Sequence, residues 1–449
     1  MKHLIFNLSK NGVSGISGYD NEFSDAEIDI KIPNTFLRKQ PIGLPEVTEI
    51  DVIRHYTTLS KNSHGVDNGA YPLGSCTMKY NPKRNDAMTQ FDGFKYAHPS
   101  QPMQTLRGLW EMLFLLGHYI AEITGMDAVS LQPAAGAHGE LTGLMIMKAY
   151  FQSRNEIRNT ILVQDSAHGT NLASASMVGF KCKIIPTRQD GLMDINALKE
   201  AITPDVAGIM MTNPSTFGLF EEHISIVSNL LHENGSILYY DGANLNALMG
   251  IIRPGDMGFD IVHVNTHKTF STPHGGGGPG AGPVGVKSFL EQFLPVPVII
   301  RVGDKFEPDY NRPFSIGKVK SYFGHISVLI RAYCYILTCG AEGLKTASEN
   351  AVLNANYIQV KLSHIFPPVF KKYCMHECLL NGDTLNINLS EFAKRLIEEG
   401  IHPPTLVGAG CVYFPGELKS GMLIEPTETE SLESLDRIID VFSKSHFAP

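Results

Sequence analysis

The sequence has no long hydrophobic run and no basic run. Its apolar stretches, such as residues 109–120, are interrupted by Glu111 and His118 and are shorter than the roughly 20 residues that a membrane span needs. The formal net charge of -8 argues against nucleic acid as a partner. The first residues carry neither the apolar block of a signal peptide nor the Arg-rich composition of a transit peptide. We therefore expect a protein that binds neither membrane nor nucleic acid.

Cysteine is also sparse, and its pattern excludes a disulfide framework. Seven cysteines are scattered over the chain, an odd number that suits a reducing compartment, so the cytoplasm is the expected location. One local cluster, Cys374-Met-His-Glu-Cys378, allows a zinc site as an alternative to a strand end. It lacks the second Cys/His pair that zinc spacing requires.

What is present is the composition of a large globular protein. Hydrophobic residues make up 43% of the 449 positions and charged residues 18%, which allows one large α/β domain with smaller pieces. The Gly- and Pro-punctuated start, residues 1–70, is predicted to be an arm. Residues 71–335 are predicted to form a large domain, and residues 336–449 a small C-terminal α/β domain.

Strand-like and helix-like segments alternate through the large domain. Apolar spacing predicts a helix over 102–126 that ends at Gly125, and a second helix over 141–151. Further strands are expected at 128–131, 160–164, 181–185, 207–212, 236–240, 260–264 and 283–286, and helices at 170–178, 194–201 and 221–233. This alternation predicts a mostly parallel sheet of seven strands flanked by helices on both faces. Residues 295–317 are expected to be a Pro-rich connection, followed by a helix over 324–339.

Polar residues follow several of these strands. Segments 165–168, 213–214, 241–244 and 265–268 all come where a parallel strand ends, so we expect them to meet at one edge of the sheet. Lys268 is a candidate nucleophile there. The glycines at 275–278 follow this lysine, which is the wrong order for a Walker phosphate loop. An ordinary solvated lysine is the alternative on that residue alone.

The same edge offers the groups that pyridoxal phosphate requires. Small residues before the helix at 141 leave its backbone NH groups open to a phosphate. A lysine can bind the aldehyde, and a carboxylate can keep the ring nitrogen protonated. The stretch between Asp241 and Lys268 is long enough for one crossover between adjacent parallel strands. The sequence therefore predicts a single pyridoxal-phosphate site.

Eight motifs carry a resemblance to a known family. They are YPLGSCTMK (71–79), QPAAGAHGE (132–140), SAHGTN (166–171), MTNPST (211–216), YDGAN (240–244), HKTF (267–270), PHGGGGPG (273–280) and IEPTETE (424–430). Through most of its length the chain resembles glycine decarboxylase, the P-protein of the glycine cleavage system. The length is similar to that of the second subunit of its two-subunit bacterial and archaeal form.

The resemblance implies a type I pyridoxal-phosphate fold, like that of aspartate aminotransferase, and assigns roles to particular residues. Lys268 would be the Schiff-base lysine, Asp241 would lie at the ring nitrogen, and His168 would stack on the ring. Asn244 would lie near the phenolic oxygen and Asn213 beside the ring. The backbone of Ala135, Gly136 and Ala137, together with the side chain of His267, would surround the phosphate.

The resemblance also implies an activity and partners. Glycine would lose its carboxylate as carbon dioxide, and the aminomethyl group would pass to the lipoyl arm of the H-protein. Subunit 1 would be the partner, in a heterotetramer of two copies of each subunit. The loops at 71–83 and 275–282 are candidates for the mouth of the pocket. Ser75, Thr77 and Arg301 are candidates for binding the substrate carboxylate, and no metal is expected.

The sequence departs from the family pattern at a few positions and leaves rivals open. Proline would be expected in place of Leu172 and leucine in place of Thr266, and the region 379–390 looks shorter than in relatives. Neither point difference removes a group that the chemistry needs. A cysteine desulfurase, with Cys411 as its mobile cysteine, or an aminotransferase is the enzymatic alternative. The alternative outside enzymes is a non-catalytic subunit. Such a subunit would be expected to lack the lysine, and Lys268 is present.

Overall fold

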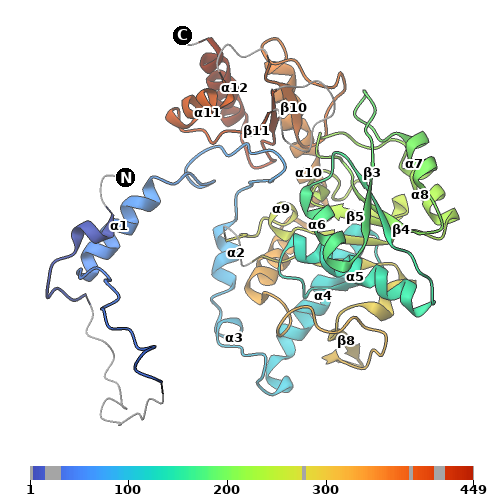
Figure 1. Ribbon diagram of the computed structural model, residues 1–449, viewed down its shortest axis with the longest axis horizontal. Helices are drawn as coiled ribbons and strands as arrows, with labels where there is room; N and C mark the ends of the chain where they lie inside the picture. The colour runs from blue at the N-terminus through green and yellow to red at the C-terminus, as the bar shows by residue number, and fades with distance from the viewer. Residues whose placement is uncertain (1–3, 16–31, 276–279, 384–387, 409–419, 448–449) are drawn as a thin grey trace. The chain divides into compact units, whose positions relative to one another are not determined.

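The computed structural model describes residues 4–15, 32–275, 280–383, 388–408 and 420–447 (Figure 1). The chain divides into two compact units, Met1–Gly65 and Val66–Pro449. The first contains helix α1 (Glu49–Lys61), whose start is capped by the Thr48 hydroxyl accepting the Asp51 N–H at 3.2 Å. The predicted borders at 71 and 336 remain predictions. Within the described ranges, none of the helices combines the length and apolarity needed to cross a bilayer.

A seven-stranded sheet organises the second unit. Its order is β1-β7-β6-β5-β4-β2-β3. Neighbours from β3 to β6 are parallel, and β7 runs antiparallel to both β6 and β1. The strands are β1 (Ala128–Ser130), β2 (Thr160–Gln164), β3 (Lys181–Ile185), β4 (Val206–Thr212), β5 (Ile237–Gly242), β6 (Ile261–Val264) and β7 (Val284–Val286). The predicted seven-stranded, mostly parallel sheet is confirmed.

Helices cover both faces because the buried strands carry apolar side chains in both directions. Leu238 and Tyr240 of β5 pack on one side with α4 (Arg107–Thr124), α8 (Ile224–Glu233) and the start of α10 (Ile326–Leu362). Tyr239 and Ile237 pack on the other side with α5 (Gly136–Ser153). This domain also contains the helices α2 (Lys83–Met88), α3 (Asp92–Lys95), α6 (Gly169–Val178), α7 (Ile195–Ala201) and α9 (Thr266–Thr269). Helix α4 ends at Gly125, whose φ of 71° suits glycine.

Two segments differ from the sequence-based expectation. The region read as a Pro-rich connection contains a hairpin of β8 (Val298–Val302) and β9 (Lys305–Asp309), which turns at Gly303 with φ 61°. The helix expected over 324–339 is followed directly by a second helical stretch within α10. The two stretches are separated by Gly340, which has φ 60° and ψ -174°. Flanking prolines had hidden the short strand alternation in the hairpin.

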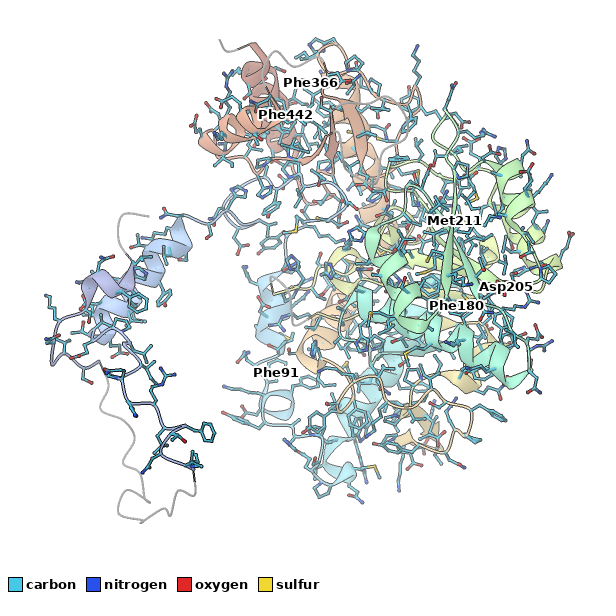
Figure 2. The ribbon with its side chains drawn as sticks, viewed as in Figure 1. Phe91, Phe180, Asp205, Met211, Phe366 and Phe442 are labelled. Atoms are coloured by element: carbon cyan, nitrogen blue, oxygen red, sulfur yellow. The ribbon has the colours of Figure 1, made fainter. Side chains whose placement is uncertain are left out.

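The C-terminal part contains a three-stranded antiparallel sheet of order β10-β12-β11. Its strands are β10 (Cys378–Asn381), β11 (Thr405–Gly408) and β12 (Ser420–Ile424), and α11 (Leu389–Glu398) and α12 (Leu432–Phe447) pack on it. Its core includes Phe366 and Phe442, marked in Figure 2. Cys374 and Cys378 are buried in the same core, and no possible metal group among the described residues includes a cysteine. The zinc alternative therefore has no support here.

Candidate active site

The carboxyl ends of four neighbouring parallel strands supply the predicted residues. His168 follows β2, Asn213 follows β4, Asp241 lies at the end of β5, and Lys268 follows β6 on the short helix α9 (Thr266–Thr269). Because β2, β4, β5 and β6 are adjacent and parallel, these ends share one edge of the sheet. The crossover from Asp241 to Lys268 uses two 3-10 turns, Leu245–Ala247 and Pro254–Met257.

Asp241 is a buried carboxylate held by two donors, with an imidazole ring close by. Its Oδ2 accepts from Asn171 Nδ2 at 2.9 Å, and its Oδ1 accepts from the Ala243 N–H at 3.0 Å and lies 3.3 Å from His263 Nε2. Burial opposes ionisation. His263, the hydrogen bonds and the charge of Lys268 outweigh it, so the pKa of Asp241 is lowered. An ionised carboxylate at this depth can hold a protonated ring nitrogen.

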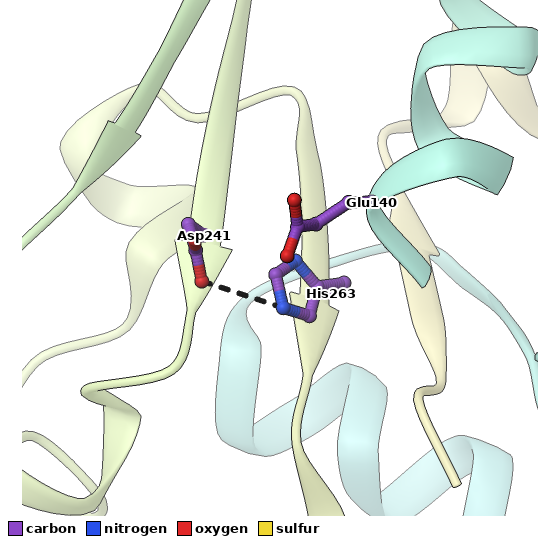
Figure 3. A group of neighbouring side chains, drawn as sticks. All are labelled: Glu140, Asp241 and His263. Carbon is purple, nitrogen blue, oxygen red and sulfur yellow. Dashed lines mark ion pairs between the residues drawn. The ribbon is translucent and has the colours of Figure 1, made fainter. Parts of the chain in front are cut away.

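His263 on the neighbouring strand β6 lies next to Asp241 (Figure 3). The ring is fully buried, and burial lowers its pKa, so it is neutral. Its Nδ1 lies 2.9 Å from the Tyr239 hydroxyl and its Nε2 lies 2.8 Å from Asn265 Oδ1. A neutral ring with the proton on Nε2 accepts from Tyr239 and donates to Asn265. The 3.3 Å contact then lies between a neutral ring and an anion and is not a pair of opposite charges.

Glu140 on α5 lies beside this pair (Figure 3). Its carboxyl accepts from Asn171 Nδ2 at 2.9 Å and from Thr170 Oγ1 at 3.0 Å. Burial and then the charge of Asp241 raise its pKa to about 8, so Glu140 is protonated at neutral pH. The Asn171 amide therefore bridges one ionised and one neutral carboxyl. The sequence did not single out Glu140, because burial beside another acid cannot be read from a motif.

The Lys268 ammonium and the His168 ring face the same space. Lys268 Nζ donates to the Ser75 carbonyl at 2.7 Å. His168 begins α6, and its Nδ1 accepts the Thr170 N–H at 3.3 Å. Burial, followed by the charge of Lys268, lowers the pKa of His168, which keeps the ring neutral. A neutral, partly open imidazole is suited to stacking on an aromatic cofactor.

An anion cradle lies at the start of α5. Ala135 precedes the helix without a side-chain cap, so the first-turn N–H groups of Gly136 and Ala137 are open to an anion. A Cβ on Gly136 would lie 2.0 Å from Asn265 Nδ2, so glycine alone permits this approach. The buried Nδ1 of His267 has no hydrogen-bond partner within the protein part described. Burial lowers the pKa of His267 to about 3.

The two predicted asparagines support the loops of the site. Asn213 is fully buried, and its Oδ1 accepts the Glu221 N–H at 2.9 Å. Asn244 donates to the Pro214 carbonyl at 2.9 Å and approaches Glu377 Oε1 at 3.4 Å. Their assignment to the ring and its phenolic oxygen remains a prediction.

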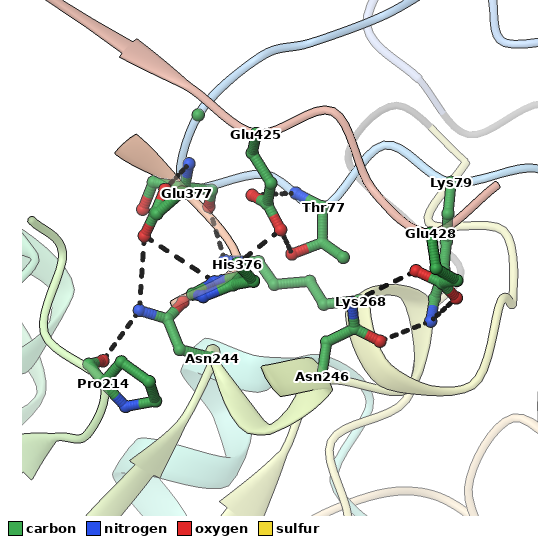
Figure 4. A network of polar contacts seen from close by, with 12 residues as sticks. Thr77, Lys79, Pro214, Asn244, Asn246, Lys268, His376, Glu377, Glu425 and Glu428 are labelled. Atoms are coloured by element: carbon green, nitrogen blue, oxygen red, sulfur yellow. Dashed lines mark hydrogen bonds and ion pairs between the residues drawn. The ribbon is translucent and has the colours of Figure 1, made fainter. Parts of the chain in front are cut away.

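The 71–79 segment reaches this edge through two left-handed residues, Ser75 with φ 64° and Thr77 with φ 48°. The Ser75 N–H donates to Glu377 Oε2 at 2.7 Å. The Thr77 N–H and hydroxyl donate to Glu425 at 2.8 and 2.5 Å (Figure 4). Backbone held in this sparsely populated region is typical of functional sites. The main-chain N–H groups of Ser75 and Thr77, the two residues predicted to bind the substrate, are therefore occupied by protein carboxyl groups.

The structure also describes the third substrate candidate, Arg301, and the two positions that depart from the family pattern. Arg301 is exposed on β8, and its guanidinium contacts the Gly303 carbonyl and Asp304 within the hairpin. The Thr266 hydroxyl is satisfied by Thr272 Oγ1 at 2.9 Å, and Leu172 packs at the edge of a core cluster. Positions 276–279 of the glycine loop, 384–387 of the shortened region, and Cys411 lie outside the described residues.

The sequence matches two protein-family models. Residues 32–306 match the model described as glycine cleavage system P-protein, and residues 347–446 match that of the glycine dehydrogenase C-terminal domain. The chain belongs to the glycine cleavage system P-protein family. This confirms the resemblance that the eight motifs carried.

P-protein relatives extend over nearly the whole chain. Probable glycine dehydrogenase (decarboxylating) subunit 2 of Caldanaerobacter subterraneus subsp. tengcongensis is 53% identical over 98% of this chain and 90% of its own length. The protein of the same description from Alkaliphilus oremlandii is 51% identical over the same shares. A crystal structure of a P-protein in inhibitor-bound form superposes with a TM-score of 0.77 at 20% identity, over 92% of this chain and 93% of that one.

The fold is shared more widely than the chemistry. The cysteine desulfurase CsdA from Escherichia coli superposes with a TM-score of 0.64 at 16% identity, over 84% of this chain and 95% of that one. The expected type I fold is therefore confirmed. The residues present fit pyridoxal phosphate, because an uncapped helix start, an ionised buried carboxylate and a lysine converge on one edge of the sheet.

Proposed function

We propose that this chain is a glycine dehydrogenase (decarboxylating). With pyridoxal phosphate it releases the carboxylate of glycine as carbon dioxide and transfers the aminomethyl group to the lipoyl disulfide of the H-protein. The observation that carries the proposal is the placement of Asp241 and Lys268 at the carboxyl ends of the adjacent parallel strands β5 and β6 of a P-protein chain. When bound, the cofactor supplies the electron sink that accepts the electron pair left by departing carbon dioxide.

Each protein group then has a defined task. Lys268 would hold the cofactor through its aldehyde, and the Ser75 carbonyl, 2.7 Å from Nζ, would hold the lysine amine when it is free. Asp241 keeps the ring nitrogen protonated, because its own pKa is lowered in spite of burial. His168 is assigned to the ring face. The N–H groups of Ala135, Gly136 and Ala137 are assigned to the phosphate, with His267 beside them.

The substrate side is assigned to Ser75 and Thr77. The main-chain N–H of each donates to a glutamate, and so does the Thr77 hydroxyl. Of the donors of Ser75 and Thr77, the Ser75 hydroxyl therefore remains to bind the carboxylate of glycine. Asn213 and Asn244 are assigned to the ring surroundings, and they act by holding the loops of residues 213–221.

The partners and location are part of the same proposal. The relatives are described as subunit 2, which supports a partner subunit 1. We assign the complex two copies of each subunit, lipoylated H-protein as acceptor, and the cytoplasm as its location. Native mass spectrometry of the chain co-expressed with subunit 1 should give a two-plus-two assembly. A mass that corresponds to one copy of each would correct the stoichiometry.

Spectroscopy and isotope exchange test the reaction. The purified chain with pyridoxal phosphate should show a visible absorbance band, and borohydride should fix the cofactor on Lys268, as located by peptide mapping. Glycine, subunit 1 and H-protein should together support exchange of labelled carbon dioxide, and Lys268→Ala should not. A colourless protein under saturating cofactor would overturn the cofactor assignment. A spectral response to cysteine and none to glycine would favour a desulfurase.

A further inference from the structure

A second cluster of buried acids lies next to Lys268. His376 and Glu377 precede β10, Glu425 follows β12, and all three side chains have an exposed fraction of 0% (Figure 4). His376 Nε2 lies 3.7 Å from Glu377 Oε1 and 3.7 Å from Glu425 Oε1. These distances are too long for hydrogen bonds, and neither ring nitrogen has a partner within the described structure.

The two carboxyls are anchored by the 71–79 segment. Glu377 accepts the Ser75 N–H at 2.7 Å, and Glu425 accepts the Thr77 N–H at 2.8 Å and its hydroxyl at 2.5 Å. The carbonyl of the same Ser75 accepts from Lys268 Nζ. One residue therefore connects the acids to the lysine. Glu377 and Lys268 are therefore separated by a single hydrogen-bonded residue.

The surrounding charges determine how many protons the cluster keeps. Lys268 faces all three groups, whereas Lys79 is paired with Glu428 at 2.8 Å. The thiols of Cys76 and Cys374 also face the cluster, and burial raises the pKa of Cys76, which keeps it neutral. One cation thus stands against two carboxyls, which favours a single negative charge on the pair.

The titration of the pair agrees with this count. Burial raises the pKa of Glu425 to about 7. Burial and then the charge of Glu425 raise the pKa of Glu377 well above its ordinary value. Burial, with Lys268 and Lys79, lowers the pKa of His376 to about 3, so its ring is neutral. Two coupled acids titrate as a unit, and the first proton leaves while the second stays.

Resting on the proposed function, we propose that Glu377 and Glu425 hold one proton between them and deliver it to the sulfur that leaves when the lipoyl disulfide accepts the aminomethyl group. In that step the electron pair left on the substrate carbon forms a C–S bond and the S–S bond breaks. The electrons of the S–S bond stay on the second sulfur as a thiolate. Zwitterionic glycine, the disulfide and one proton give carbon dioxide, a thiol and an aminomethyl thioether with its ammonium. The overall reaction therefore consumes one proton, which the pair supplies and solvent replaces.

His376 lies at equal distance from both carboxyls. A neutral imidazole has one N–H and one acceptor nitrogen, so a small shift lets it donate to one carboxyl while it accepts from the other. It is a positioning residue for the shared proton.

Infrared spectroscopy tests the shared proton without turnover. The wild-type holoenzyme should show the carbonyl stretching band of a protonated carboxylic acid, shifted in heavy water. Glu425→Gln and Glu377→Gln should each change that band, and Glu430→Gln should leave it unchanged. Glu430 lies in the same 424–430 motif but hydrogen-bonds Ser434. Absence of a band that depends on Glu377 or Glu425 would overturn the proposal.

Kinetics test the use of the proton. Because the pair keeps one proton after the first leaves at about pH 7, transfer to lipoylated H-protein by wild type should persist as pH rises through about 7 and fall only at higher pH, where Glu377 ionises. Glu425→Gln should reduce transfer at neutral pH by about 10²-fold or more, the usual contribution of a general acid, and should change this pH profile. Glu425→Ala should recover part of the rate when formic acid is added. The visible band and its response to glycine should persist in both variants.

Three results would overturn the proposal. The first is a Glu425→Gln variant with the rate and pH profile of wild type. The second is failure of formic acid to rescue Glu425→Ala while both variants retain the glycine response. The third is a divalent ion that wild type binds and Glu425→Gln does not. The last would mean that the cluster holds a cation. Failure of the proposed function is a separate outcome, because wild type itself would then show no response to glycine while the infrared band remained.

Discussion

Replacement of Glu140 by glutamine offers a quantitative test of the electrostatics around Asp241. In the unfolded chain this carboxyl ionises at its ordinary pKa of 4.5, and in the folded chain it does so at about 8. Between these values the unfolded chain has released a proton that the folded chain still binds. A carboxyl with a raised folded pKa therefore reduces stability as pH rises through this window, by about 1.4 kcal/mol per pH unit.

The magnitude follows from the width of that window. Near pH 7 the penalty amounts to about 3 kcal/mol, whereas near pH 5 it is below about 1 kcal/mol. Glutamine cannot ionise, so Glu140→Gln should gain stability relative to wild type by about 3 kcal/mol between pH ~5 and ~7.5. Loss of the hydrogen bonds from Asn171 and Thr170 subtracts about 1 kcal/mol, nearly equally at both pH values.

The assay is urea unfolding of the cofactor-free chain at the two pH values. Glu200→Gln, an exposed change on α7, serves as the matched control and should show no such difference. If Glu140→Gln changes the free energy of unfolding equally at both pH values, Glu140 is not held protonated in the fold.

Three further changes address the cofactor site. Asp241→Asn should lower glycine-dependent carbon dioxide release by at least about 10²-fold while borohydride still fixes the cofactor on the protein; unchanged release would contradict the role of the carboxylate. Gly136→Ala brings a Cβ to 2.0 Å from Asn265 Nδ2 and should weaken cofactor affinity about 10-fold in equilibrium dialysis, whereas Gly108→Ala, which meets nothing within 4 Å, should not. Thr266→Leu removes a buried hydroxyl that pairs with Thr272 at 2.9 Å and should cost about 1–3 kcal/mol in unfolding; a stabilised variant would show that leucine fits better here.

The large sheet and its active edge were accessible from sequence because their signals are local. Strands 160–164 and 181–185 were predicted with the bounds observed, and Gly125 ends α4 as expected. His168, Asp241 and Lys268 each lie where a strand ends. Because these strands are parallel and belong to one sheet, the three residues meet at the same edge. Helix α5 begins at Gly136, five positions before the predicted start, because the small and polar residues 136–140 show no apolar period.

The acids on the substrate side could not be predicted in the same way. Glu377 and Glu425 flank strands of the small sheet. The pairing of Leu73 with Ile424 brings Ser75 and Thr77 to them, and Ser75 also contacts the lysine. Glu425 lay within a motif quoted for the family resemblance, yet its pairing with Thr77 spans 348 positions. Sequence spacing carries no information about contacts of that range. The β8–β9 hairpin, in contrast, had a usable signal in Gly303-Asp304.

The long span of that pairing affects how the protein is made. A ribosome releases the sheet, Lys268 and the left-handed turn at Ser75 and Thr77 well before Glu425 emerges. Until then the turn lacks the carboxyl that accepts its N–H and hydroxyl. Nascent chains that stop short of β12 would therefore expose an unfinished pocket to free aldehydes in the cell. Completion of synthesis, and not the appearance of the lysine, sets the moment at which the turn at Ser75 and Thr77 gains its full set of hydrogen bonds.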